Sequence, residues 1–419
     1  MRRWLAGRGF YYGWVVAVAC FVVNGVVFGM TYSFGVFLDP LVSSFGASTA
    51  RTSLVFGIQL FVLYVFAAPM GGLIEWLGAR RSLVLAAGLL GGGMVAGSRA
   101  ETLGVLIVAY GVVTGTGMSL AYVVGYATAP QWFQRNRGMA TGLASAGLGM
   151  GLVVIAPTAS TLVARVGWRG AFPLLGGGLA AALVLAALVM ADDPAHVGAA
   201  VEAEFPGGRP SSDDGWRDQF DAVRQVATSR AFLLLFAGYV LMYVTLYVLL
   251  NHLVNFAGEQ GIRQTGVLAI SVVGGTTTLT RLAVGGVADR VGRLAVYVLC
   301  GSVMAVTVMA LPLARAPAAL LAVAVCFGVG YGGTGALMSS VVADLFGGKN
   351  LNTLFGLVSL SFAVPGLFAP PVAGLGFDRL GTYSPVFVVA GVVGLCGVAL
   401  VAGAARLRGQ LELPVSAPL

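Results

Sequence analysis

The sequence predicts an all-α membrane protein with twelve transmembrane helices in two pseudo-symmetric six-helix bundles. Of its 419 residues, 58% are apolar and only 10% are charged, whereas soluble domains carry roughly 25% charged residues. The apolar residues form twelve runs, each close to the ~20 residues that one membrane-spanning helix needs. A constant spacing of 214 residues relates the two halves. These observations exclude a soluble fold and a disordered chain.

The apolar runs give approximate boundaries for the predicted helices. In the first half they cover about 13–37, 53–75, 82–98, 103–129, 138–163 and 170–191. In the second half they cover about 230–256, 265–288, 294–313, 318–343, 353–376 and 384–405. We therefore expect an N-terminal bundle over 1–191, a cytoplasmic linker over 192–229 and a C-terminal bundle over 230–419. Eight of the 16 acidic residues fall in the linker, which suits a solvated segment.

The basic residues predict that both termini are cytoplasmic. With that orientation, 16 of the 24 Lys and Arg residues lie on the inner side, seven lie outside, and Arg281 lies within a span. Inner loops of membrane proteins are enriched in Lys and Arg. Topology thus explains the net charge of +8, and we expect no nucleic-acid partner. No N-x-Ser/Thr sequon occurs, which favours a prokaryotic inner membrane.

An internal repeat links the two halves. Parallel repeats of this kind are typical of transporters that bind substrate between their halves, near the membrane midplane. The pairs at the 214-residue spacing are Gly71 and Gly285, Glu75 and Asp289, Gly78 and Gly292, Gly142 and Gly356, Pro157 and Pro371, and Gly167 and Gly381.

Two paired loops carry a recognisable motif. The segment 285–293 reads GGVADRVGR and matches G-x-x-x-D-R-x-G-R, the signature of the major facilitator superfamily, while 71–81 reads GGLIEWLGARR and departs from it at Glu75 and Trp76. The sequence therefore resembles that superfamily, which implies the major facilitator fold and charged loops that close the inner face. The inner-gate residues implied are Gly71, Glu75, Arg80, Arg81, Gly285, Asp289, Arg290 and Arg293.

Two further segments resemble the monocarboxylate transporters and their bacterial oxalate–formate antiporter relatives. They are FYYGWVV at 10–16 and WFQRNRGMATGLASAGLG at 132–149. The resemblance implies secondary transport of a small monocarboxylate such as lactate or pyruvate, coupled to a proton, by a functional monomer without a cofactor. The small residues of the second segment, Gly142 and Gly147 among them, also predict close helix packing. Tyr11 and Tyr12 are expected in the aromatic belt at the membrane interface.

Arg281 is the strongest candidate for substrate binding. A membrane-buried Arg costs at least about 2.5–3.5 kcal/mol, so it needs a partner. Arg281 lies eight residues before Asp289, roughly 12 Å along a helix, and therefore near the midplane. No acidic residue lies mid-span, which leaves a substrate carboxylate, held by two parallel hydrogen bonds, or carbonyls of the opposing bundle.

The subgroup resemblance favours the substrate, because its members carry an Arg at this place on helix eight. Animal monocarboxylate transporters also have an Asp one turn earlier, where this chain has Thr277, and a Lys on helix one, which this chain lacks. Both departures weaken the expectation of proton coupling that the resemblance implies.

Other polar residues near the expected midplane complete the predicted site. Buried hydroxyls and amides need partners, which a carboxylate can supply; hydrogen bonding between helices is an equal alternative for the last four of this set. The candidates are Tyr122, Tyr331, Asn24, Gln59, Tyr32 and Thr277. His252, near the outer end of helix seven, is a candidate proton site because its reference pKa lies near 6.5; a hydrogen bond at the outer gate is the alternative.

Other function classes fit the sequence less well. No nucleotide-binding loop, metal-ligand cluster or nucleophile–base pair occurs, so we expect no enzyme, no cofactor and no metal. A non-transporting sensor would need an output domain that the linker cannot hold. A dicarboxylate–monocarboxylate exchanger remains the alternative carrier. Oxalate–formate antiporters pair the helix-eight Arg with a Lys on helix eleven, whereas that helix has no basic residue here.

Overall fold

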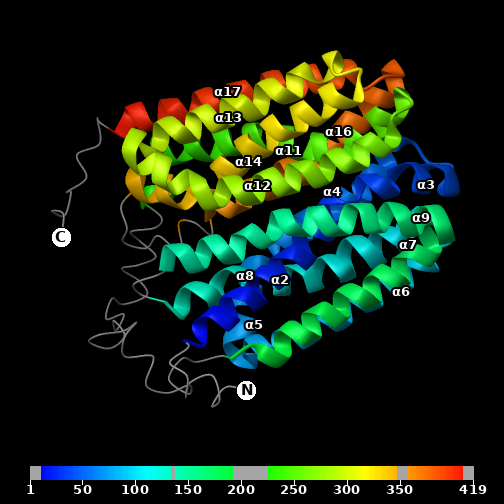
Figure 1. Cartoon of the computed structure of the whole chain (residues 1–419), viewed down its shortest axis with the longest axis horizontal. Helices are drawn as coiled ribbons and strands as arrows, with labels where there is room; N and C mark the ends of the chain where they lie inside the picture. The colour runs from blue at the N-terminus through cyan, green and yellow to red at the C-terminus, as the bar shows by residue number, and fades with distance from the viewer. Residues whose placement is uncertain (1–10, 134–136, 192–224, 347–353, 355–356, 409–419) are drawn as a thin grey trace.

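The predicted all-α fold class is confirmed by a computed structural model of the chain. The structure describes residues 11–133, 137–191, 225–346, 354 and 357–408, and the regular elements in these ranges are all helical. The linker expected over 192–229 lies mostly outside the described residues. Figure 1 shows two groups of helices side by side, one built from the first half of the chain and one from the second.

The first group, the N-terminal bundle, contains α2 (Gly13–Tyr32), α3 (Gly35–Phe45), α4 (Thr49–Val65), α5 (Ala67–Leu77), α6 (Ala79–Ser98), α7 (Leu103–Leu106), the π-helix η1 (Ile107–Thr114), α8 (Gly115–Gln131) and α9 (Arg137–Val189). The second group, the C-terminal bundle, contains α11 (Arg230–Glu259), α12 (Arg263–Val291), α13 (Arg293–Ala310), η4 (Leu311–Leu313), α14 (Pro317–Phe346), η5 (Leu360–Phe362), α16 (Ala363–Leu380) and α17 (Ser384–Arg408).

The described helices account for twelve membrane spans. Ten ranges are long and apolar enough to cross a bilayer, and α4 with α5, bent by 62°, makes an eleventh. One of the ten, α9, has 53 residues, roughly 80 Å of straight helix against a hydrocarbon core of about 30 Å. Gly167 breaks α9 with a φ of 68°, so this range supplies two spans.

Helix boundaries differ from the predicted runs in two places. The first run was expected to end near 37, but α2 ends at Tyr32 and α3 continues to Phe45. The Ser33 and Thr31 hydroxyls donate hydrogen bonds to carbonyls one turn back, Gly29 and Val27 respectively. Such bonds compete with the backbone ladder and bend helices. The predicted break between runs five and six is a single residue, Gly167, within α9.

The 214-residue repeat is visible in the backbone. Gly78 and its counterpart Gly292 have φ angles of 80° and 108°, and Gly167 and its counterpart Gly381 have φ angles of 68° and 72°. Residues with a side chain rarely adopt positive φ. The same two positions of each half therefore need glycine, one before the third helix of a bundle and one before its sixth.

The two ends of the molecule differ in how the bundles meet. We call the end formed by α3, the start of α4 and the end of α16 the closed end, because close inter-bundle contacts lie there. The opposite end, the motif end, carries 71–81 and 285–293. The described chain begins at α2 and finishes at α17 on this motif end (Figure 1).

Candidate substrate site

Arg281 lies in α12 at the boundary between the bundles. Its side chain is 9% exposed. One turn closer to the closed end, the Thr278 hydroxyl donates to the carbonyl oxygen of Ala146 on α9, 3.1 Å away. Within the described ranges no carboxylate pairs with Arg281, and its Nε has no hydrogen-bond partner. The guanidinium is therefore a buried cation without a counter-ion in this part of the chain.

Tyrosines surround the guanidinium instead. The Arg281 Cζ lies 5.5 Å from the centre of the Tyr331 ring, a distance at which a cation is attracted to an aromatic face. Tyr126, on α8 of the opposite bundle, lies close enough to interact with the charge of Arg281. Tyr243 and Tyr32 are the other tyrosines close enough to interact with its charge. Aromatic faces and neutral hydroxyls compensate the charge of a cation only partly, so a bound anion would stabilise the guanidinium further.

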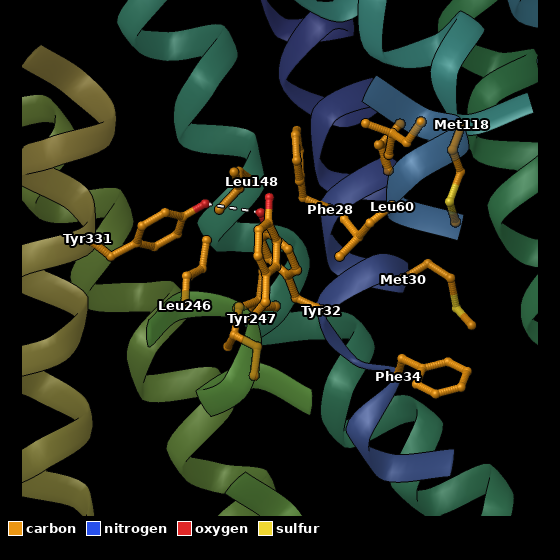
Figure 2. Close-up of a cluster of buried hydrophobic side chains, with 14 of the residues drawn as sticks. Phe28, Met30, Tyr32, Phe34, Leu60, Met118, Leu148, Leu246, Tyr247 and Tyr331 are labelled. Atoms are coloured by element: carbon orange, nitrogen blue, oxygen red, sulfur yellow. Dashed lines mark hydrogen bonds between the residues drawn. The ribbon is translucent and has the colours of Figure 1, made fainter. Parts of the chain in front are cut away.

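A tyrosine pair joins the two bundles beside Arg281. The hydroxyls of Tyr32 on α2 and Tyr331 on α14 lie 3.3 Å apart, and both residues are buried. Figure 2 shows the two side chains pointing toward one another between α2 and α14, with Tyr247 beside Tyr32. Two of the predicted site residues are therefore in direct contact across the inter-bundle boundary.

Tyr122 occupies the N-terminal side of the same cluster. Its ring centre lies 5.8 Å from that of Phe28 and 5.0 Å from that of Tyr126, and Ser359 of the opposite bundle lies close to its hydroxyl. Phe362 packs 5.3 Å from Tyr64 and 4.5 Å from Tyr243, measured between ring centres. Tyr64 in turn lies 5.7 Å from Tyr122. Aromatic residues from both bundles thus form one continuous cluster next to Arg281.

Three predicted residues are engaged in bonds between helices. The Asn24 amide donates to the carbonyl oxygens of Gly125 and Ala144, at 3.2 and 2.9 Å. The Gln59 amide donates to the Thr31 hydroxyl at 2.9 Å. All three predicted residues, Asn24, Gln59 and Thr277, are fully buried. Their contacts favour the second of the two alternatives, hydrogen bonding between helices.

The third of these, Thr277, lies one helical turn before Arg281 on α12. Its hydroxyl donates to the Gly328 carbonyl oxygen on α14, at 3.2 Å. The bond ties α12 to α14 within the C-terminal bundle. A neutral hydroxyl that donates to a carbonyl adds no negative charge near Arg281.

Polar contacts between the bundles hold the closed end together. Asp39 on α3 forms an ion pair with Arg263 on α12 and accepts a hydrogen bond from the Asn255 amide on α11. The Asp378 carboxylate on α16 accepts hydrogen bonds from the backbone N–H groups of Thr49 and Ala50, at 3.1 and 3.0 Å. The carboxylate of one bundle therefore caps a helix of the other.

His252 belongs to this closed end. It is fully buried, and its Nε2 lies 2.9 Å from the Pro370 carbonyl oxygen while Nδ1 lies 3.1 Å from the Tyr383 hydroxyl. The amide nitrogen of Asn251 lies 3.1 Å from the same Nε2, so both ring nitrogens have polar neighbours. The structure places His252 near the closed end, bonded within the C-terminal bundle, and not in the tyrosine cluster.

The charged residues of the motif end interact within their own bundle. Arg293 pairs with Asp289 at 3.1 Å and with Asp344 of α14 at 3.2 Å, while Glu75 and Arg290 are exposed. A methyl group added at Gly71 or Gly285 would meet no atom within 4 Å. Arg80 and Arg81 line a pocket of about 610 Å³ with Leu77 and Val84. In this conformation the described motif residues do not hold the bundles together.

Sequence reasoning missed two residues close to Arg281, Tyr126 and Tyr243, and a third in the same aromatic cluster, Tyr247. Tyr126 follows Tyr122 by four residues on α8, and Tyr247 follows Tyr243 by four on α11. Residues four apart share a helix face, so the predicted Tyr122 contained the signal for Tyr126. Tyr243 and Tyr247 carried no such signal, because α11 was expected to contribute only His252.

Comparisons with known proteins agree with this arrangement. The sequence profile of the Major Facilitator Superfamily matches residues 20–285 and 261–414. The chain is 34% identical over 387 residues to monocarboxylate transporter 3 of Rattus norvegicus, covering 91% of this chain and 77% of that protein. It is 29% identical over 396 residues to monocarboxylate transporter 13 of Bos taurus, covering 92% and 88%.

A solved structure shares the fold. The crystal structure of a bacterial homologue of the human lysosomal transporter Spinster, described as inward-facing and unoccupied, has a TM-score of 0.67 and 15% sequence identity, and covers 95% of this chain and 96% of that one. The ranges matched by the family profile and the identity to the rat protein together establish the family of this chain. The chain belongs to the major facilitator superfamily and, within it, to the monocarboxylate transporter family, and it is a multi-pass membrane transporter and not an enzyme.

Proposed function

We propose that the protein carries a small monocarboxylate such as lactate or pyruvate together with a proton, and that Arg281 binds the carboxylate. The observation that carries the proposal is the Arg281 guanidinium, buried without a carboxylate partner in the described chain and with its Nε unbonded. A carboxylate would accept two parallel hydrogen bonds from it and neutralise its charge. Membership of the monocarboxylate transporter family supports this substrate class.

The surroundings of Arg281 support a monoanion with a short apolar tail. Phe28 and Phe362 belong to the aromatic cluster beside Arg281, so a hydrocarbon tail would meet apolar rings. The described η5 and α16 hold no basic residue before Arg379, at the closed end of α16. A dianion would therefore leave about one charge uncompensated, at a cost of several kcal/mol. We expect lactate or pyruvate to compete for uptake and oxalate to compete poorly.

The two ends suggest the direction in which the described conformation faces. By sequence, 16 of the 24 Lys and Arg fall on the side of the loops 71–81 and 285–293 and seven on the other side, so we propose that the motif end is cytoplasmic, as are both termini. With that orientation the closed end is extracellular and the structure is inward-facing. Alternating access would then require the inter-bundle contacts of Asp39 and Asp378 to break. The prokaryotic inner membrane remains a prediction based on the absence of sequons.

Arg281→Gln tests the binding site. Truncating one member of a buried charge pair typically costs about 3–5 kcal/mol, so lactate counterflow in proteoliposomes should fall by two orders of magnitude or more while protein level stays near normal. Arg281→Lys should also fail largely, because an ammonium lacks the planar fork. Arg99→Gln, at an exposed position, is the matched control. Normal counterflow with Arg281→Gln would remove Arg281 from the site.

His252→Gln tests the proton route. We propose that His252 faces water when the closed end opens and takes up the proton there. The variant should keep counterflow, which needs no net proton movement, and lose accumulation driven by an imposed inward pH gradient. Full pH-driven accumulation in His252→Gln would instead assign the proton to the substrate. Failure of a pH gradient to drive uptake in the unmodified protein would refute proton coupling.

A further inference from the structure

The Arg281 side chain lies in a space that opens only because residue 335 has no side chain. A Cβ built at Gly335 of α14 would lie 2.2 Å from Arg281 Nη2, 2.8 Å from Cζ and 3.4 Å from Nε. These three guanidinium atoms are the nearest atoms to that Cβ position. The guanidinium therefore lies directly against the backbone of α14.

Tyr331 forms the other part of the α14 surface that the guanidinium contacts. It precedes Gly335 by four residues, one helical turn along the same face of α14. Its ring centre lies 5.5 Å from Arg281 Cζ, and its hydroxyl is 3.3 Å from that of Tyr32. One turn of α14 thus offers an aromatic face and, next to it, a place without a side chain.

We infer that Gly335 is a positioning residue for substrate binding, because it sets how far the Arg281 guanidinium stands from α14. The inference rests on the proposed role of Arg281 as carboxylate ligand. With alanine at this position, the guanidinium must retreat by at least about 1.2 Å, from 2.2 Å to an ordinary contact distance of 3.4 Å or more. A carboxylate bound to it is displaced by a similar amount, away from α14, and its tail must move with it. Binding geometry tolerates only about 0.5 Å of such error.

Gly335→Ala therefore has two expected effects on transport. The KM for lactate in counterflow should rise about tenfold, the loss expected when one charge-assisted hydrogen bond becomes misaligned. The KM for formate, which has no tail, should rise less, so the ratio of the two KM values should increase. Vmax per folded molecule should change little, because Gly335 does not contact the closed end.

Gly330→Ala is the control for helix packing. Gly330 lies on the same helix, and a Cβ there would meet α13, at 2.7 Å from the Cys300 carbonyl oxygen and 2.9 Å from the Met304 N. It should reduce the amount of folded protein without changing the KM ratio. An equal rise in the ratio with Gly330→Ala, or an unchanged lactate KM with Gly335→Ala, would overturn the inference.

A double variant covers the case in which Gly335→Ala is absent from the membrane. Arg281→Ala removes the atoms that the new methyl group would strike. Gly335→Ala/Arg281→Ala should therefore recover the protein level, as judged by fluorescence-detected size exclusion. No recovery would assign the defect to packing of α14 and refute the positioning role. Counterflow by Arg281→Gln distinguishes this inference from the proposed function. If the Arg281→Gln variant still performs counterflow, the proposed function is refuted. If Arg281→Gln loses counterflow while Gly335→Ala keeps a normal lactate KM, only this inference is refuted.

Discussion

Asp39→Asn should make the closed end open more often. Asp39 and its partner Arg263 are 47% and 38% exposed, so their ion pair contributes roughly 0.2–1 kcal/mol. The second contact comes from Asn255, which is only 6% exposed, and a hydrogen bond to a charged acceptor contributes about 1.5–3 kcal/mol. An asparagine here keeps an oxygen acceptor but loses the charge. We therefore expect a net loss of about 1 kcal/mol, which raises the open fraction about fivefold.

The change can be measured by cysteine labelling at the closed end. Ser53 is fully buried there, 3.1 Å from the Asn251 amide, so Ser53→Cys reports opening through its reaction with a membrane-impermeant maleimide. The exposed Cys326 and Cys396 are replaced in all variants. Glu101→Gln, an exposed acidic position at the same end, is the matched control.

Asp39→Asn should label about five times faster than its parent, and high salt should reduce the difference because salt screens exposed charges. Equal labelling rates would refute the reasoning, as would the same acceleration with Glu101→Gln.

Two further predictions concern the packing of the N-terminal bundle. Asn24→Leu removes two hydrogen bonds between helices, each worth about 0.6 kcal/mol on average in membrane proteins, so thermal unfolding in detergent should occur a few degrees lower; an unchanged midpoint would contradict it. Gly147→Ala places a methyl group 1.9 Å from the Phe21 carbonyl oxygen of α2 and should sharply reduce folded protein, since overpacking costs typically about 1–3 kcal/mol. Gly142→Ala, which meets nothing within 4 Å, should be tolerated, and equal loss in both variants would show that the clash is not the cause.

Patterns that involve one helix at a time were predictable from the sequence. Apolar run length identified the spans, and the repeat spacing identified Gly78 and Gly167 together with their counterparts. The expectation of close packing held for Gly147, which lies against the α2 backbone, but Gly142 faces open space. The two positions are five residues apart, so they point in different directions from α9. Small side chains allow another helix to pack closely, but the position of that helix decides which of the small residues it contacts.

Contacts between helices account for most of what the sequence could not show. Tyr12 was expected in the interfacial belt, and the structure adds a contact that the sequence did not show: the side chain is 3% exposed, and its hydroxyl donates to the Val189 carbonyl oxygen at 2.7 Å. Its ring also lies 6.0 Å from that of Trp132. From the sequence alone, a tyrosine near the start of a span can face lipid or pack against protein. The position of the neighbouring helix end determines which of the two occurs.

The cap that Asp378 provides for α4 has a consequence for the energetics of transport. When the closed end opens, the backbone N–H groups of Thr49 and Ala50 lose their carboxylate acceptor. Both groups lie at a helix start, on the end that would then face the aqueous phase, so water molecules can take the place of the carboxylate. The exchange replaces one hydrogen-bonded state by another and leaves no buried donor unsatisfied. A carrier must visit both conformations in every cycle, and contacts that water can replace keep their free energies within reach of one another.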